Sequence, residues 1–137
     1  MKLCSACLLG VRCRYDGASK PDSRVISMAK LDVLVPVCPE QLGGLATPRR
    51  PSEIRGKKVV TDLEDDLTHQ FNRGAEETLN IAKHLGITEA IMKQSSPSCG
   101  CGKIHDGTFS DKIIKGDGIT TALLKKNGIN VMTEEDL

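Results

Sequence analysis

Six cysteines are the residues of this 137-residue chain whose type and placement point most clearly to chemistry. Three of them, Cys7, Cys38 and Cys99, follow short apolar runs that are typical of strands. Cys4 and Cys7 also form a CxxC motif, and Cys99 and Cys101 form a CxC motif, both of which suit metal or redox sites. A single free cysteine is often only a small buried hydrophobic residue. Six cysteines clustered beside Gly, Pro and Ser favour a functional site instead.

A single iron–sulfur cluster suits these dispersed cysteines better than a structural zinc ion does. No second CxxC motif follows at the spacing of a zinc site. Thiolates are the soft ligands that iron–sulfur clusters need, and glycines let the backbone approach the inorganic sulfides. If only three cysteines bind a cubane cluster, one iron stays open and acts as a Lewis acid. Because such an iron is thiophilic, a sulfur-containing substrate is its natural ligand.

Groups that can transfer protons lie beside the cysteines. Glu40 follows Cys38 by two residues, and a carboxyl at the rim of a partly dry site can work as an acid or base near neutral pH. Ser96 and Ser98 precede Cys99, and either hydroxyl can hold water or a substrate carbonyl. A Ser-Pro pair is also an ordinary turn signal, so both serines have a structural explanation as well.

The remaining polar candidates are weaker. Lys93 can lend positive potential at a strand end, although a solvated lysine is the more common case. His69 and His84 fall on a predicted helix, where solvated or partly packed side chains are expected rather than ligands. His105 falls in a predicted loop and is only a distant candidate ligand.

The composition indicates one compact α/β domain over residues 1–137. Hydrophobic residues make up 39% and charged residues 27%, which excludes a disordered or fibrous chain. Nineteen basic and eighteen acidic residues leave a net charge of +1, so neither a polymeric nucleic acid nor an acidic membrane is expected as a partner. No secretory signal and no run of about twenty apolar residues is found, so we expect a cytoplasmic protein with reduced thiols.

Short apolar runs alternate with helical patterns along the chain, which predicts an α/β fold with a mostly parallel sheet flanked by helices. The predicted helices cover residues 65–85 and 119–126, and residues 102–118 between the later elements are expected to form a loop. The strands are predicted at residues 2–6, 32–37, 58–61, 88–92 and 129–132, the third of them at an edge or in a hairpin.

The longest predicted helix is marked by an apolar stripe at spacings of three and four residues, from Leu67 to Ala82. Thr61 with Glu64, or the acidic pair at 65–66, is expected to cap its start, and Gly86 to end it. Three cysteines then follow three predicted strands. If these strands are parallel neighbours, their carboxyl ends meet at one edge of the sheet and the cysteines converge there.

Short motifs spread in order over nearly the whole chain also match a known pattern. They are SACLLG at 5–10, RYDG at 14–17, VCPE at 37–40, GGL at 43–45, TPR at 47–49, GA at 74–75, Lys93, SPSCG at 96–100, DGTF at 106–109 and GDG at 116–118. In this combination they resemble a small bacterial and archaeal family, formerly a domain of unknown function, that contains the iron–sulfur thiouracil desulfidases.

This resemblance implies a Rossmann-like α/β domain that holds a [4Fe-4S] cluster on Cys7, Cys38 and Cys99. It further implies Glu40 as the proton-transfer residue and Ser96 as the essential serine, with Ser98 as the alternative. The implied reaction is a desulfidation without net redox change. The sulfur of a 2-thiouracil-like pyrimidine, or of a related small sulfur compound, passes to the open iron, and the base and sulfide are released.

The residues leave two other functions open. One is a thiol-based sulfur carrier or redox protein that uses Cys4 with Cys7, or Cys99 with Cys101, and needs no iron. The other is a sensing or assembly module that binds a cluster and performs no chemistry. Cys4, Cys13 and Cys101 lie where the family pattern does not require cysteine, so they are spare thiols, or one of them binds the fourth iron.

Overall fold

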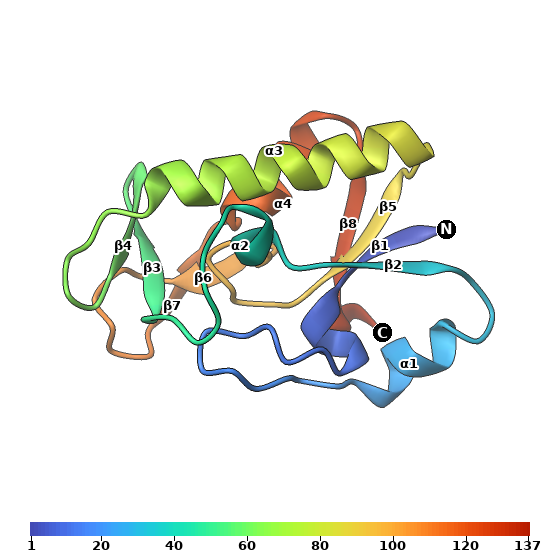
Figure 1. Ribbon diagram of the computed structural model, residues 1–137, viewed down its shortest axis with the longest axis horizontal. Coiled ribbons are helices and arrows are strands. Elements are labelled where there is room, and N and C mark those ends of the chain that lie inside the picture. The colour runs from blue at the N-terminus through green and yellow to red at the C-terminus, as the bar shows by residue number, and fades with distance from the viewer.

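The computed structural model describes residues 1–137, and a four-stranded parallel sheet in the order β2-β1-β5-β8 forms its centre (Figure 1). Its strands are β1 (Lys2–Ser5), β2 (Leu34–Val37), β5 (Glu89–Met92) and β8 (Asn130–Thr133). In register, Leu3 of β1 lies opposite Val35 on one side and Ala90 on the other. The predicted parallel sheet is therefore confirmed.

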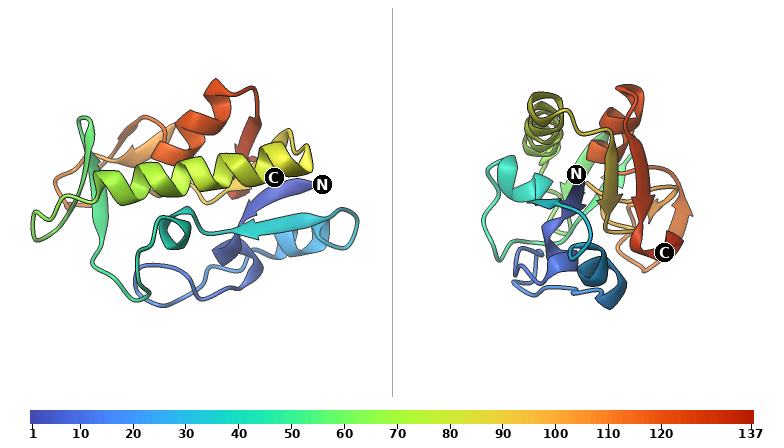
Figure 2. Two further views of the ribbon diagram at one scale, coloured as in Figure 1. Left: turned by 45° about the horizontal axis from the view of Figure 1, so that its top comes forward. Right: turned by 90° about the vertical axis from the view of Figure 1, so that its right-hand side faces the viewer.

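Helices cover both faces of this sheet, as predicted. α3 (Thr68–Leu85) and α4 (Ile119–Lys126) lie on one face, and α1 (Ser23–Met28) lies on the other with the short 3-10 helix η1 (Ala6–Leu9) (Figure 2). Alternate residues of β1 serve the two faces, because Leu3 belongs to the first apolar core and Cys4 to the second. No helix is both long enough and apolar enough to cross a lipid bilayer.

Two antiparallel hairpins lie outside the central sheet, at the left of Figure 1. β3 (Ser52–Arg55) pairs with β4 (Lys58–Thr61), which confirms the predicted hairpin strand at 58–61. β6 (Lys103–His105) pairs with β7 (Ile113–Lys115) inside the region expected to be a loop, so that expectation was wrong. Strands of three residues with lysine and histidine among them carry too little alternation to be recognised in a sequence.

The start of α3 also differs from the prediction. The helix begins at Thr68, three residues later than expected, and the predicted capping box is absent. The Thr61 hydroxyl accepts hydrogen bonds from the backbone N–H groups of Leu63 and Asp65, so it stabilises a turn after β4 instead. The N-cap residue is Leu67, which makes no side-chain cap, so neither predicted cap is found; the Asp66 carboxylate one residue earlier accepts from the Thr68 N–H at 2.9 Å.

Helix α2 (Pro39–Leu42) follows β2 and packs closely against α3. Two glycines allow this approach, since a Cβ atom on Gly43 would collide with the carbonyl oxygen of Gln70, and one on Gly74 with that of Pro39. The short helix α2, and the acidic residue in its first turn, are thus held against the long helix by backbone contact.

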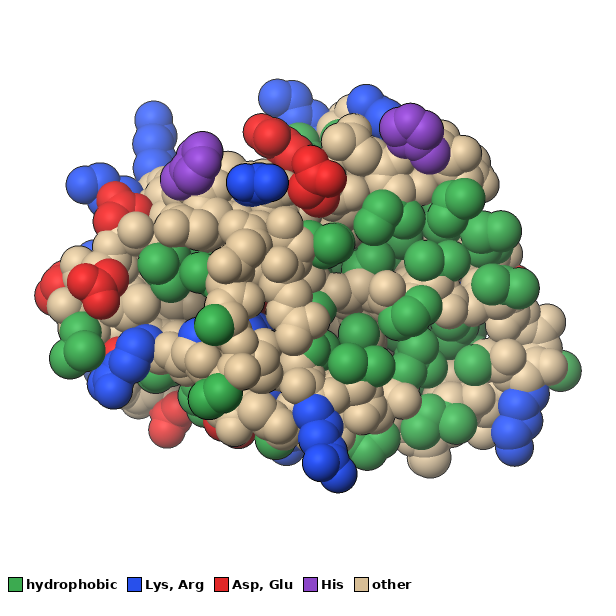
Figure 3. All heavy atoms as spheres, viewed as in Figure 1, with side chains coloured by type: hydrophobic (Ala, Val, Ile, Leu, Met, Phe, Trp, Pro, Cys, Tyr) green, Lys and Arg blue, Asp and Glu red, His purple; other side chains and the backbone are tan.

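Apolar side chains gather on the right-hand half of the face shown in Figure 3, which corresponds to the side of edge strand β2 in Figure 1. Leu31 and Val33, just before this strand, are largely exposed. Pro36 lies within β2 and lacks the N–H group that a further paired strand would need. The open edge of the sheet is therefore a poor template for additional strands.

Candidate functional site

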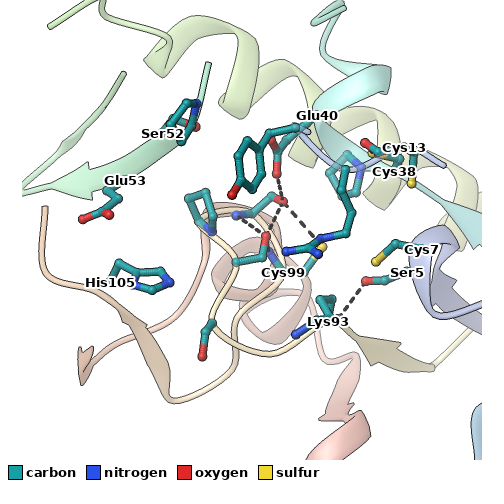
Figure 4. Close-up of a pocket in the computed structure, with 18 of the residues that line it drawn as sticks. Ser5, Cys7, Cys13, Cys38, Glu40, Ser52, Glu53, Lys93, Cys99 and His105 are labelled. Atoms are coloured by element: carbon teal, nitrogen blue, oxygen red, sulfur yellow. Dashed lines mark hydrogen bonds between the residues drawn. The ribbon is translucent and has the colours of Figure 1, made fainter. Parts of the chain in front are cut away.

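The carboxyl ends of the central strands open into a pocket of about 490 Å³ (Figure 4). The chain leaves β1 toward β2 on one side, whereas β5 and β8 lie on the other, so the strand order reverses between β1 and β5. Ligands of open α/β sheets bind at such a switch point. Cys7, Cys38 and Cys99 all line this pocket, so the expected convergence of the three strand ends is found.

Each of the three cysteines is placed by a different element. Cys7 lies in η1 immediately after β1, and Cys38 is the residue before the first turn of α2. Cys99 lies in the loop after β5, where the Thr121 hydroxyl donates to its carbonyl oxygen at 2.8 Å. The N–H groups of Thr120 and Thr121 also donate to the carbonyl oxygen of Ser98, the residue before Cys99. The first turn of α4 therefore anchors this loop.

The thiols of the pocket are largely shielded from water. Burial raises the pKa of Cys99 to about 12. The pKa of Cys38 is also raised, first by its contact with the Cys13 thiol and then by burial. The protonated forms of the Cys38 and Cys99 thiols are therefore favoured, and a metal group that binds these two thiols must displace their protons.

The cysteine arrangement fits a group larger than one metal ion. No three His, Cys, Asp or Glu side chains lie close enough together to hold a single ion. Cysteines that bind different irons of one cubane stand further apart than the ligands of a single metal ion. Three soft thiol donors from three strand ends, around one shared pocket, match the donor set of a [4Fe-4S] cluster.

A chain of polar contacts leads from Arg49 through Glu40 to the thiols. The Arg49 guanidinium donates to Glu40 Oε1 at 3.0 Å, and the side chains are only 8% and 13% exposed. The other carboxylate oxygen, Oε2, accepts from the Ser98 hydroxyl at 2.9 Å. Ser98 Oγ in turn lies 3.5 Å from Cys99 Sγ. One carboxylate oxygen is thus fixed by a cation, and the other faces a hydroxyl beside a predicted ligand.

Ser96 and Ser98 have different surroundings although both line the pocket. The Ser96 hydroxyl accepts from the N–H groups of Ser98 and Cys99, each at 3.1 Å, and therefore closes the turn that presents these residues. Its oxygen lies 3.0 Å from that of Ser98. Only the Ser98 hydroxyl reaches Glu40 directly.

Three further residues shape the site, and only Lys93 among them was named as a candidate from the sequence. Arg49 belongs to the TPR motif, but only the fold shows that it pairs with Glu40. Gln94 is buried, and its amide makes hydrogen bonds to both the N–H and the carbonyl of Cys101, closing the loop after β5. Lys93 is not a freely solvated lysine, because its ammonium pairs with Glu134 at 2.9 Å.

The other cysteines and histidines are distributed unevenly. Cys4 is fully buried in the core, away from the pocket, and burial raises its pKa to about 12. The thiol of Cys101 faces the carbonyl oxygen of Val131 at 3.8 Å, also outside the pocket. Cys13 does line the pocket. Each of the two short cysteine pairs therefore contributes only one thiol to the pocket.

The three histidines separate in the same way. His69 and His84 are exposed on α3, as expected. His105 of β6 lines the pocket, on the side opposite the thiols in Figure 4. The sequence predicted this histidine in a loop, and a loop prediction does not place a residue relative to the site.

Known proteins are similar to this chain in sequence and in structure over nearly its whole length. The model of the 2-thiouracil desulfurase family matches residues 3–136. The uncharacterized protein YbbK of Bacillus subtilis (strain 168) is 42% identical over 147 residues, covering 100% of this chain and 97% of that protein. A solved structure of the [4Fe-4S]-dependent thiouracil desulfidase TudS is 43% identical, with a TM-score of 0.94, and covers 99% of this chain and 91% of that chain.

Proposed function

This chain belongs to the 2-thiouracil desulfurase family, and on this premise we propose that it is a [4Fe-4S]-dependent desulfidase that removes sulfur from thiouracil. The observation that carries the proposal is the meeting of three strand-end cysteines with a carboxylate and a hydroxyl in one pocket. The similarity to TudS supports the same cofactor and reaction, because it extends over 99% of this chain at 43% identity.

Cys7, Cys38 and Cys99 would hold the cluster. When bound by three thiolates, a [4Fe-4S] cluster supplies a fourth iron without a protein ligand, a thiophilic Lewis acid that polarises the C–S bond of the substrate. Cys13 also lines the pocket beside Cys38, and we assign it no ligand role. Of these three cysteines, Cys7 and Cys99 are buried and Cys38 is partly exposed.

Glu40 and Ser98 would move the protons of the reaction. Conversion of a thiocarbonyl into a carbonyl consumes one water and releases hydrogen sulfide, so protons pass from the water to the departing sulfur. A water that donates to Ser98 Oγ can pass a proton through the hydroxyl to Glu40 Oε2, 2.9 Å away. The Ser98 hydroxyl lies 3.5 Å from Cys99 Sγ, so the same relay reaches the sulfur side of the pocket.

Arg49 and Ser96 would orient this relay without reacting themselves. The ion pair of Arg49 with Glu40 Oε1 leaves Oε2 as the oxygen that exchanges a proton with Ser98. Ser96, the serine that the family resemblance implies, holds the turn through the N–H groups of Ser98 and Cys99. In this assignment the Ser98 hydroxyl exchanges the proton with Glu40, and Ser96 is essential because it holds Ser98 in place.

We place this activity in the cytoplasm and in one domain covering residues 1–137. All six cysteines are free thiols, which suits a reducing compartment. A small thiolated base is the expected partner, since the pocket of about 490 Å³ holds a small molecule and not a folded nucleic acid.

The proposal is tested by reconstituting the protein with iron and sulfide under anaerobic conditions. We expect about four irons per chain, a brown colour, and equimolar uracil and sulfide from 2-thiouracil. A protein that holds its irons but leaves a panel of thiolated bases intact would refute the enzyme and favour a sensing module. An iron-free protein that takes sulfane sulfur from a persulfide donor and carries it on one of its cysteine pairs would favour the sulfur carrier.

A further inference from the structure

The pocket has a second wall that does not come from the central sheet. The two hairpins form it, and Ser52, Glu53 and His105 stand there across the pocket from the thiols (Figure 4). Phe109 and Asp111 of the loop between β6 and β7 also line the pocket. A substrate whose sulfur points toward the thiols therefore turns its opposite edge toward the hairpins.

This hairpin wall is fixed by a buried carboxylate. Glu53 Oε1 accepts hydrogen bonds from the N–H groups of Gly107 and Phe109, at 3.0 and 3.1 Å. The Arg55 guanidinium donates to the carbonyl oxygen of Gly107 at 2.9 Å, which joins the two hairpins again. Phe109 has a φ of +56°, a left-handed conformation that is uncommon for a residue other than glycine. Such strained residues concentrate at ligand-binding sites.

His105 is the polar side chain of this wall that lacks a partner. Neither ring nitrogen makes a hydrogen bond, and Nδ1 is one of only two buried side-chain polar atoms in the protein without one, the other being Thr120 Oγ1. Nε2 is not enclosed in this way. Because no protein group fixes the tautomer, Nε2 can either donate or accept a hydrogen bond. A pyrimidine offers both a carbonyl oxygen and ring N–H groups.

The aromatic residues point to the same class of ligand. The chain has one tyrosine, two phenylalanines and no tryptophan. Phe71 is buried in the protein interior, whereas Tyr15 and Phe109 both line the pocket. Aromatic side chains are the usual stacking surface for the faces of nucleobases. A chain so poor in aromatic residues thus places its tyrosine and one phenylalanine where a planar base would bind.

We propose that His105 determines substrate recognition, with Nε2 hydrogen-bonding the edge of the thiolated pyrimidine that lies away from the C–S bond. Tyr15 and Phe109 supply the stacking surface, and Glu53 positions the loop that carries Phe109. This inference rests on the proposed desulfidase function and adds the residue that selects the base. His105 is a binding residue, so its removal weakens substrate binding and leaves the chemical step unchanged.

The test compares His105→Phe, which keeps an aromatic ring, with His105→Gln, whose amide places a donor and an acceptor near the position of Nε2. Uracil binding to the reconstituted protein is measured by calorimetry, and desulfuration of 2-thiouracil by steady-state kinetics. For His105→Phe we expect the Kd for uracil and the KM to rise about three- to tenfold, with kcat within about twofold. For His105→Gln we expect values within about threefold of the unmodified protein. Iron content should be unchanged in both, and His69→Phe on α3 is the matched control.

An unchanged KM and Kd in His105→Phe would overturn the inference. Equal losses in His105→Phe and His105→Gln would overturn it too, because they would indicate packing rather than hydrogen bonding. The proposed function fails separately, if the unmodified protein does not release sulfide from 2-thiouracil.

Discussion

The two walls of the pocket are built in different ways. The thiol wall stands on the carboxyl ends of parallel strands and is anchored by buried backbone contacts, such as those of α4 to the loop with Cys99. The hairpin wall consists of short antiparallel strands outside the core, tied together by Glu53 and Arg55. We infer from this difference that the residues at the strand ends carry out the reaction and that the residues of the hairpins recognise the substrate.

The largest effect is expected on the thiol wall, from replacing a proposed cluster ligand. Cys38→Ser should lose most of the bound iron and all detectable sulfide release, because serine is a poor substitute for a soft thiolate. Iron content and activity are measured after anaerobic reconstitution. Cys13→Ser is the matched control in the same pocket and should keep its iron. Full iron in Cys38→Ser would remove Cys38 from the ligand set, and equal iron loss in both variants would add Cys13 to it.

The next largest effect is expected at Glu40, on the same wall. Glu40→Gln keeps the size of the side chain and removes its proton-accepting oxygen, so kcat should fall about 10²- to 10⁴-fold. Iron content and KM should stay near those of the unmodified protein. A kcat within about twofold of normal would contradict the proton-transfer role. Loss of iron would instead make Glu40 a residue that supports the cluster.

Replacing the two serines one at a time should have different effects. Ser98→Ala removes the hydroxyl that reaches Glu40, so kcat should fall about 10- to 100-fold while iron is retained. Ser96→Ala removes the acceptor for two N–H groups of the turn, so iron retention and thermal stability should fall as well. Kinetics and iron content, measured together with thermal unfolding, separate the two. A loss of kcat in Ser96→Ala alone, with iron intact, would reverse the assignment.

The smallest effect is expected on the hairpin wall. Glu53→Gln keeps one amide oxygen as an acceptor for the loop N–H groups but weakens the two hydrogen bonds, so KM should rise about two- to threefold with kcat unchanged. Steady-state kinetics with 2-thiouracil checks this. A larger fall in kcat than rise in KM would show that this wall takes part in the chemistry, and the contrast between the walls would be lost.

The sequence was sufficient for the thiol wall because its residues obey a simple rule. Cys7, Cys38 and Cys99 each follow a short apolar run, and parallel strands carry their carboxyl ends to one edge. The hairpin wall was missed, since β6 and β7 are three residues each and lack a clear alternating pattern. His105 could not be assigned to the pocket without them.

Contacts between distant residues were also beyond sequence reasoning. The pairing of Arg49 with Glu40 depends on how the loop after α2 folds back, and no local pattern encodes it. The choice of Ser98 as the hydroxyl that faces Glu40 likewise depends on the turn that Ser96 closes. Where a side chain points within a correctly predicted loop is a tertiary property.

We propose that Cys7, Cys38 and Cys99 hold a [4Fe-4S] cluster whose fourth iron is open to the substrate. Mössbauer spectroscopy of the reconstituted protein, with and without 2-thiouracil, tests it most directly because it distinguishes individual irons. We expect a four-iron cluster in which one iron differs from the other three and changes its signal when 2-thiouracil is added. A cluster whose irons are all ligated by thiolates and do not respond to 2-thiouracil would contradict it.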